Sequence, residues 1–216
     1  MPPIIAEVLT RLDTTLNRAI AAATLAVMLG GLVFYTVRTA RRRKARKQLH
    51  ETIVSASVEY LSNVLVPDGM GGATHVDYLL LTPHGILVID QRDVRGNIFG
   101  GDQMTQWTVM SGARRQTFQN PQHALYDRVA VVKQLAGDDV PVEGRILFTQ
   151  GSSFPKGLPR WTITLDLLHT QFPPPDSQAA PNEVAVYREG WNALLAAVSS
   201  SSLRRGPSFL SEVFRS

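Results

Sequence analysis

Apolar positions are densest in two short segments near the middle of the chain, HVDYLLLT at residues 75–82 and GILVID at residues 85–90. Apolar side chains occupy successive positions in both segments, which is typical of interior strands that are covered on both faces. Only Pro83 and His84 separate the two segments, and so short a connection predicts a β-hairpin. The pattern therefore predicts an α/β domain with this hairpin inside its sheet.

The spacing of apolar residues predicts helices on either side of the hairpin. Apolar residues recur at helical spacing in residues 51–65, which predicts a helix there. Asn120 followed by Pro121 is typical of a helix N-cap and first turn, and an apolar stripe continues from there to Ala136. A last helix is predicted around Trp191. Further strands are predicted at residues 97–99, 107–110, 145–149 and 161–165.

Residues 20–37, IAAATLAVMLGGLVFYTV, form an uncharged run of 18 residues. At about 1.5 Å per residue, a helix of this length nearly spans a bilayer core of roughly 30 Å. We expect a transmembrane helix over residues 19–37, after a short amphipathic segment over residues 1–18. A cleaved signal peptide is one alternative, but its basic region would precede the apolar run, whereas here the bases follow it. A buried soluble helix is the other, although so long a run without a strongly polar side chain is uncommon in a small α/β core.

The formal net charge of +4 comes from one segment of the chain. Residues 38–47 hold seven bases and no acid, whereas residues 48–216 hold 13 bases and 16 acids. Because basic flanks stay in the cytoplasm, we expect a single-pass protein with its N-terminus outside and its domain inside the cell. The slightly acidic domain does not favour simple electrostatic attraction to nucleic acid.

Length and cysteine content limit the remaining choices. With 216 residues, one ordinary core with appendages is expected, not two full domains. The chain has no cysteine, which excludes disulfides and thiolate chemistry. Any metal site must therefore use oxygen or histidine ligands.

Three charged residues, Asp77, Asp90 and Arg92, lie near the ends of the two apolar segments. A hairpin loop of two or four residues places Asp77 opposite Asp90, whereas a three-residue loop places it opposite Gln91. Opposed like charges destabilise a strand pair, and a divalent cation between the carboxylates would reverse that effect. Alternation puts Arg92 on the same face as Asp90. Two interpretations stay open: a metal site, or a surface ion pair of Asp90 and Arg92 with Asp77 in a polar corner.

These residues resemble, in order and spacing, those of the nuclease-related domain (NERD), a branch of the PD-(D/E)xK nuclease-like superfamily. The resemblance covers roughly residues 48–150. It implies a restriction-endonuclease-like mixed sheet flanked by helices, here preceded by one transmembrane helix. The matching positions are Glu51, Asp77, Asp90-Gln91-Arg92, Gly96, Trp107 and Asn120-Pro121.

The resemblance also implies a chemistry. In the superfamily, acids hold Mg²⁺ or Mn²⁺ against the scissile phosphate, and a lysine orients or activates the attacking water. Asp77 and Asp90 would then be metal ligands, with Glu51 as a third unless it is only a solvated glutamate at a helix start. Two positions depart from the family pattern, because Asp90 stands in place of Glu and Arg92 in place of Lys. Arginine cannot act as a base, so Arg92 either stabilises charge on the phosphate or marks a domain that binds without cutting.

Two functions are consistent with these patterns. The first is a membrane-anchored nuclease that depends on Mg²⁺ or Mn²⁺ and acts on DNA or RNA at the cytoplasmic face of a bacterial inner membrane. The second is an inactive NERD-fold module that binds nucleic acid or a protein partner there, and a purely structural anchor would need neither the acids nor Arg92. Candidate nucleic-acid contacts are Arg114, Arg115 and Gln122, for which solvated side chains are the alternative.

The sequence thus predicts a division of the chain into seven parts. These are residues 1–18 (amphipathic segment), 19–37 (transmembrane helix), 38–47 (basic segment), 48–170 (NERD-like domain), 171–182 (Pro-rich loop), 183–199 (C-terminal helix) and 200–216 (flexible tail).

Overall fold

The structure is a computed structural model that describes the backbone of residues 3–149, 151–176 and 178–203. Side chains are described for residues 28–149, 151–176, 178–180 and 182–198. The chain divides into two compact units, Met1–Glu51 and Thr52–Ser216.

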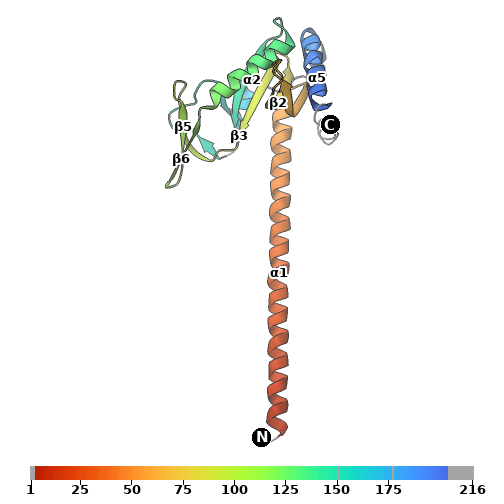
Figure 1. Cartoon of the computed structure of the whole chain (residues 1–216), viewed down its shortest axis with the longest axis vertical. Coiled ribbons are helices and arrows are strands. Elements are labelled where there is room, and N and C mark those ends of the chain that lie inside the picture. Colours follow the sequence, from red (N-terminus) through yellow and green to blue (C-terminus); the bar gives the residue numbers. More distant parts are fainter. Residues whose placement is uncertain (1–2, 150, 177, 204–216) are drawn as a thin grey trace. The chain divides into compact units, whose positions relative to one another are not determined.

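The described part of the first unit is helical and belongs to helix α1 (Pro3–Val54) (Figure 1). The last three residues of this helix, residues 52–54, are counted with the second unit. The structure does not describe the side chains of residues 1–27. The predicted amphipathic segment and the first part of the predicted transmembrane span therefore lie outside the described side chains. Over residues 28–37 most large apolar side chains are exposed, among them Met28, Leu32 and Phe34 at 72%, 59% and 65%. No helix in the described part of the chain is both long and apolar enough to cross a membrane.

The second unit is a mixed α/β fold with two sheets in its described residues. The larger sheet has the order β1-β2-β3-β7-β9, in which β1, β2 and β3 are antiparallel neighbours and β3, β7 and β9 are parallel. The predicted α/β domain with a mixed sheet and flanking helices is therefore confirmed. Its strands are β1 (Glu59–Pro67), β2 (Ala73–Thr82), β3 (Gly85–Arg92), β7 (Val142–Phe148) and β9 (Thr162–Thr164).

The predicted hairpin is formed by β2 and β3 in the interior of this sheet. Thr82 pairs with Gly85 across the two-residue loop, as expected. The Thr82 hydroxyl donates to the Gly85 carbonyl oxygen at 2.9 Å and fixes the turn. Gly85 has φ +119°, and a Cβ there would lie 2.3 Å from the Pro141 carbonyl oxygen, so only glycine fits.

The prediction of a helix over residues 51–65 is wrong beyond Val54, where α1 ends, because β1 begins at Glu59. The error has a physical source at Asn63, which has φ +54° and interrupts the regular alternation of the strand. Leu61 and Val64 therefore both face the core although three positions separate them. A spacing of three in an irregular strand imitates one turn of a helix.

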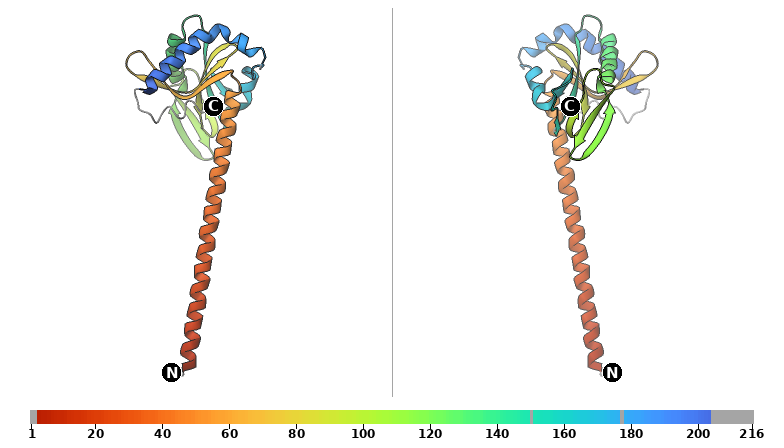
Figure 2. Two further views of the ribbon diagram at one scale, coloured as in Figure 1. Left: turned by 90° about the vertical axis from the view of Figure 1, so that its right-hand side faces the viewer. Right: turned by 90° about the vertical axis from the view of Figure 1, so that its left-hand side faces the viewer.

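Helix α2 (Pro121–Ala136) begins as the sequence predicts and packs against β7, β2 and β3 (Figures 1 and 2). The Asn120 side chain accepts from the Gln122 backbone N–H at 2.9 Å and caps the helix. A Cβ on Gly144 of β7 would lie 2.6 Å from Val129 of α2, so glycine permits the close approach of helix and sheet.

The remaining helices follow β9. Helix α5 covers β1 and packs against α2, as the blue and green helices in Figure 2 show. It begins five residues later than predicted and extends to Leu203, past the predicted end at residue 199. Two short helices were not predicted: one begins in the predicted Pro-rich loop and the other lies directly after β9. The bounds are α3 (Leu165–Gln171), α4 (Ala180–Glu183), the 3-10 helix η1 (Ala185–Tyr187) and α5 (Arg188–Leu203).

The smaller sheet has the order β6-β5-β4-β8 and carries the hairpin labelled β5 and β6 in Figure 1. Trp107 of β5 is fully buried and stacks on Phe148, so this sheet shares the core of the larger one. Arg114 and Arg115, two of the candidate nucleic-acid contacts, lie on β6 and are exposed. The strands are β4 (Gly96–Phe99), β5 (Gln106–Ser111), β6 (Arg114–Gln119) and β8 (Ser152–Ser153).

Candidate functional site

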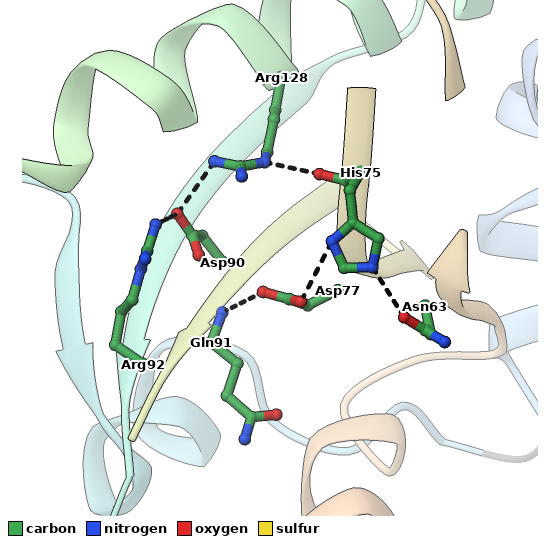
Figure 3. A network of polar contacts seen from close by, with 7 residues as sticks. All are labelled: Asn63, His75, Asp77, Asp90, Gln91, Arg92 and Arg128. Carbon is green, nitrogen blue, oxygen red and sulfur yellow. Dashed lines mark hydrogen bonds and ion pairs between the residues drawn. The ribbon is translucent and has the colours of Figure 1, made fainter. Parts of the chain in front are cut away.

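The candidate site lies where β2 and β3 separate. Their regular pairing ends at Tyr78 and Ile89, one pair before Asp77 and Asp90. Beyond that point the Gln91 N–H donates to the Asp77 carboxylate at 2.8 Å instead of to a backbone carbonyl of β2 (Figure 3). The gap between the strands is thus occupied by polar side chains.

Asp90 is the most buried charged residue of this group, with its side chain 2% exposed. Its Oδ2 atom accepts from Arg92 Nη2 at 2.7 Å and from Arg128 Nη1 at 3.1 Å (Figure 3). A buried carboxylate is costly to desolvate unless it is paired, and here two guanidinium groups share one oxygen. The ion pair of Asp90 and Arg92 weighed in the sequence is therefore present, but its acid is buried.

Arg128 was not predicted as a site residue. It extends from α2 to the strands, where its Nε donates to the His75 carbonyl oxygen at 2.7 Å. Its side chain is 19% exposed, against 36% for Arg92. The position of Arg128 in the sequence carried a signal, because a base between Leu125 and Val132 borders the apolar face of the predicted helix.

Asp77 differs from Asp90 because no arginine among the described residues pairs with it. Its Oδ1 lies 3.6 Å from His75 Nδ1, and its side chain is 30% exposed. Burial raises the pKa of Asp77, the hydrogen bond from Gln91 opposes that rise, and the nearby charge of Asp90 adds to it. Asp90 is therefore close enough to influence the pKa of Asp77, whereas the predicted direct pairing of Asp77 with Asp90 lies beyond the last regular pair of the two strands.

His75 and Asn63 complete the network and were also missed. His75 Nε2 and Asn63 Oδ1 are 2.7 Å apart (Figure 3). His75 precedes Asp77 by two residues, so strand alternation alone would have placed the two side chains together. Asn63 gave no such signal, because its position depends on the irregular backbone of β1.

The other predicted site residues lie elsewhere. Glu51 is in the first unit and pairs with Lys47 across 3.6 Å, both side chains being exposed, and its role beside Asp77 stays a prediction. Arg114 and Arg115 are on exposed β6, where contact with nucleic acid stays a prediction.

Gln122 is 5% exposed and has a structural role at the start of α2. Its Nε2 donates to Asp102 Oδ1 at 2.8 Å and to the Arg160 carbonyl oxygen at 2.7 Å. The bond from Gln122, with a second from the Arg160 N–H, lowers the pKa of Asp102. Its predicted contact with nucleic acid is untested, and both of these bonds already use its amide group.

A pocket of about 380 Å³ lies between α2 and β7 and is separate from the acids and arginines above. Its walls are largely apolar and include Leu125, Val129, Val142 and Trp161. It contains none of the predicted site residues.

A profile of the nuclease-related domain matches residues 39–149, just over half of the chain. The chain belongs to the NERD family. This confirms the resemblance found in the sequence and assigns a nuclease-related fold to the domain that carries Asp77, Asp90 and Arg92.

Comparisons beyond the family are less informative. An uncharacterized protein of Bacillus anthracis is 26% identical over 98 residues, which is 45% of this chain and 46% of that protein. The match thus spans less than half of the length of the relative. No solved structure matches the chain.

Nuclease-like domains commonly use divalent metals, so the fit of Mg²⁺ or Mn²⁺ to these residues can be tested. No group of three or more His, Asp or Glu residues in the described part of the chain is placed to hold a metal ion. At Asp90 Oδ2, a divalent ion would meet two guanidinium groups that already lie within hydrogen-bonding distance. The arrangement of these residues therefore does not fit a divalent ion.

Proposed function

We propose that the NERD domain binds the phosphate groups of nucleic acid through Arg92 and Arg128 and does not cut the strand. The observation that carries this proposal is the sharing of Asp90 Oδ2 by two guanidinium groups. The two cations outnumber the buried acid that orients them, and a guanidinium held in place loses little freedom when it donates to phosphate.

The partial exposure of Arg92 supports this proposal. At 36% exposure, Arg92 is accessible to a ligand while one of its nitrogens stays on Asp90. Its Nε is buried, so a phosphate would contact the exposed part of the guanidinium group. Arg114 and Arg115 on β6 would supply further phosphate contacts.

Binding is tested with the full chain by fluorescence anisotropy on labelled single- and double-stranded DNA and RNA, in EDTA and in Mg²⁺ or Mn²⁺. We expect equal affinity in EDTA and in metal. Arg92→Gln should weaken binding to all sequences and reduce the salt slope by about 1. Arg145→Gln is the matched control, because Arg145 also pairs with an acid, Glu143 at 3.0 Å, but forms no hydrogen bond or ion pair with the described site residues Asp77, Asp90, Arg92 and Arg128.

The metal-dependent nuclease expected from the family is the second candidate, and the closeness of Asp77 to Asp90 favours it. The same samples are therefore assayed for cleavage. Cleavage that requires Mg²⁺ or Mn²⁺ and disappears in Asp90→Ala would replace the binding proposal by this one. Absence of both binding and cleavage would rule out both and leave a protein partner or a structural anchor.

We also propose that residues 19–37 anchor the protein in a bacterial inner membrane with the domain in the cytoplasm. The uncharged run of residues 20–37 and the exposed apolar side chains at positions 28–37 support an anchor, and the seven bases that follow support the orientation. Because the chain has no cysteine, single cysteines report topology directly. Asp13→Cys should react with an impermeant maleimide in intact cells, and Ser111→Cys only after permeabilisation. Recovery of the protein in the soluble fraction would refute the anchor.

A further inference from the structure

Arg128 is held at both ends of its guanidinium group. Nε donates to the His75 carbonyl oxygen of β2 at 2.7 Å, and Nη1 donates to Asp90 Oδ2 of β3 at 3.1 Å. The group therefore bridges the two strands at the point where their own pairing has ended (Figure 3).

The guanidinium group of Arg128 lies against the Asp90 carboxylate, where a bound cation would also lie in a site built on carboxylates. Asp90 is 2% exposed and needs a neighbouring positive charge. Asp77, the second carboxylate, lies near enough for Asp90 and Arg128 both to affect its pKa. The positive charge that pairs with Asp90 and lies near Asp77 comes from the protein itself.

We propose that Arg128 takes the place of a divalent metal ion in this NERD domain and keeps the acids free of metal. A guanidinium stays protonated and cannot be removed by a chelator, so the site is neutralised at any metal concentration. A divalent ion at Asp90 would have to displace Arg128 or accept a positive charge a few ångströms away. This inference goes beyond the binding proposal and does not rest on it.

The two arginines then have different roles. Arg128 is the less exposed and has partners on two strands, so it is the fixed cation of the site. Arg92 is more exposed, which leaves it available to a ligand. Loss of Arg128 should therefore change the affinity of the site for metal.

The test measures Mn²⁺ uptake by the full chain without nucleic acid, from the electron paramagnetic resonance signal of free Mn²⁺. We expect no stoichiometric uptake by the natural protein or by Arg128→Lys, which retains a positive charge. Arg128→Ala should bind one ion per chain, with an affinity higher by about a hundredfold or more, because the less exposed of the two opposing charges is removed and the more exposed Arg92 can turn away from the ion. The added change Asp90→Asn should abolish that uptake.

Arg95→Gln is the matched control, since Arg95 lies 3.6 Å from Asp93 but is 76% exposed. It should bind no Mn²⁺. Uptake by the natural protein that Asp90→Asn removes would overturn the proposal, and so would a folded Arg128→Ala that takes up none.

Folding of Arg128→Ala provides a second measurement. Because a ligand of the folded state stabilises it, Mn²⁺ should raise the urea midpoint of this variant and leave that of the natural protein unchanged. If Arg128→Lys folds but Arg128→Ala does not fold even in saturating Mn²⁺, metal cannot replace the guanidinium and the proposal is wrong.

Discussion

Asp90→Ala tests how strongly the buried carboxylate holds its two arginines. The substitution leaves the guanidinium groups of Arg92 and Arg128 without their shared acceptor. Arg128 retains its bond to the His75 carbonyl oxygen, so part of its hydrogen bonding survives. We expect the free energy of unfolding to fall.

The size of the loss follows from the exposure of each partner. A hydrogen bond to a charged group contributes about 1.5–3 kcal/mol, and Arg128, at 19% exposure, retains most of that value. Arg92 is 36% exposed, so solvent screening reduces its share to about 0–1 kcal/mol. The expected cost is about 2–4 kcal/mol, in line with the loss of one partner of a buried ion pair.

Urea unfolding followed by tryptophan fluorescence measures this cost. Trp107, Trp161 and Trp191 are the three tryptophans of the chain and all lie in Thr52–Ser216, so the signal reports the second unit. The matched control is Asp93→Ala. Asp93 is 65% exposed and pairs with Arg95 at 3.6 Å, so its removal should cost no more than about 1 kcal/mol.

A double-mutant cycle separates the ion pair from other effects of Asp90→Ala. The cycle uses Asp90→Ala, Arg128→Ala and the variant with both changes. If Asp90 and Arg128 interact as described, the loss of unfolding free energy in the double variant should differ from the sum of the two single losses by about 1–3 kcal/mol. A cost of Asp90→Ala below about 1 kcal/mol, or additive behaviour in the cycle, would refute the view that Asp90 orients the two arginines.

Three further predictions concern the frame around the site, each measured by urea unfolding. Gly144→Ala should cost about 1–3 kcal/mol, because the added methyl group meets Val129 at 2.6 Å; an unchanged midpoint would show that α2 moves freely. Asn120→Ala removes the helix cap and should cost about 1–2 kcal/mol, and a neutral result would contradict the cap. Burial raises the pKa of Asp77 in the folded state above its value in the unfolded state. The contribution of Asp77 to the free energy of unfolding is therefore complete below the unfolded-state pKa and is lost as pH rises through the folded-state pKa. The change in the free energy of unfolding that Asp77→Asn causes, relative to the natural protein, should therefore be more stabilising at pH 7 than at pH 3. The opposite order would contradict the raised pKa.

Local signals in the sequence were sufficient for the central hairpin and for the start of α2. The hairpin was predictable because its apolar residues and two-residue loop determine the register, so Thr82 pairs with Gly85. The start of α2 was predictable because Asn120 and Pro121 act on the backbone next to them. Both features depend on residues that are close together in the chain.

The site was only partly predictable because it depends on contacts between distant residues. Asp77 and Asp90 were proposed from the hairpin register, and in the structure they lie one position beyond its last regular pair. Arg128 reaches Asp90 across 38 positions of the chain, and no pattern in the hairpin indicates that α2 supplies a cation. The helix wrongly predicted after Val54 has a similar cause, since Asn63 tolerates a left-handed φ by its type but adopts it here in a folded sheet, beside His75 twelve positions away.

The arginine at position 92 and the arginine of α2 are best understood as one feature. Both donate to the same oxygen of Asp90, so the charge of either one alters the environment of the other. Changing Arg92 to the lysine of the family pattern would leave Arg128 in place, and with it the positive charge that opposes a metal ion. The positive charge at Asp90 therefore comes from α2 as well as from the hairpin, and the Asp90-Gln91-Arg92 motif alone does not reveal the part that α2 supplies.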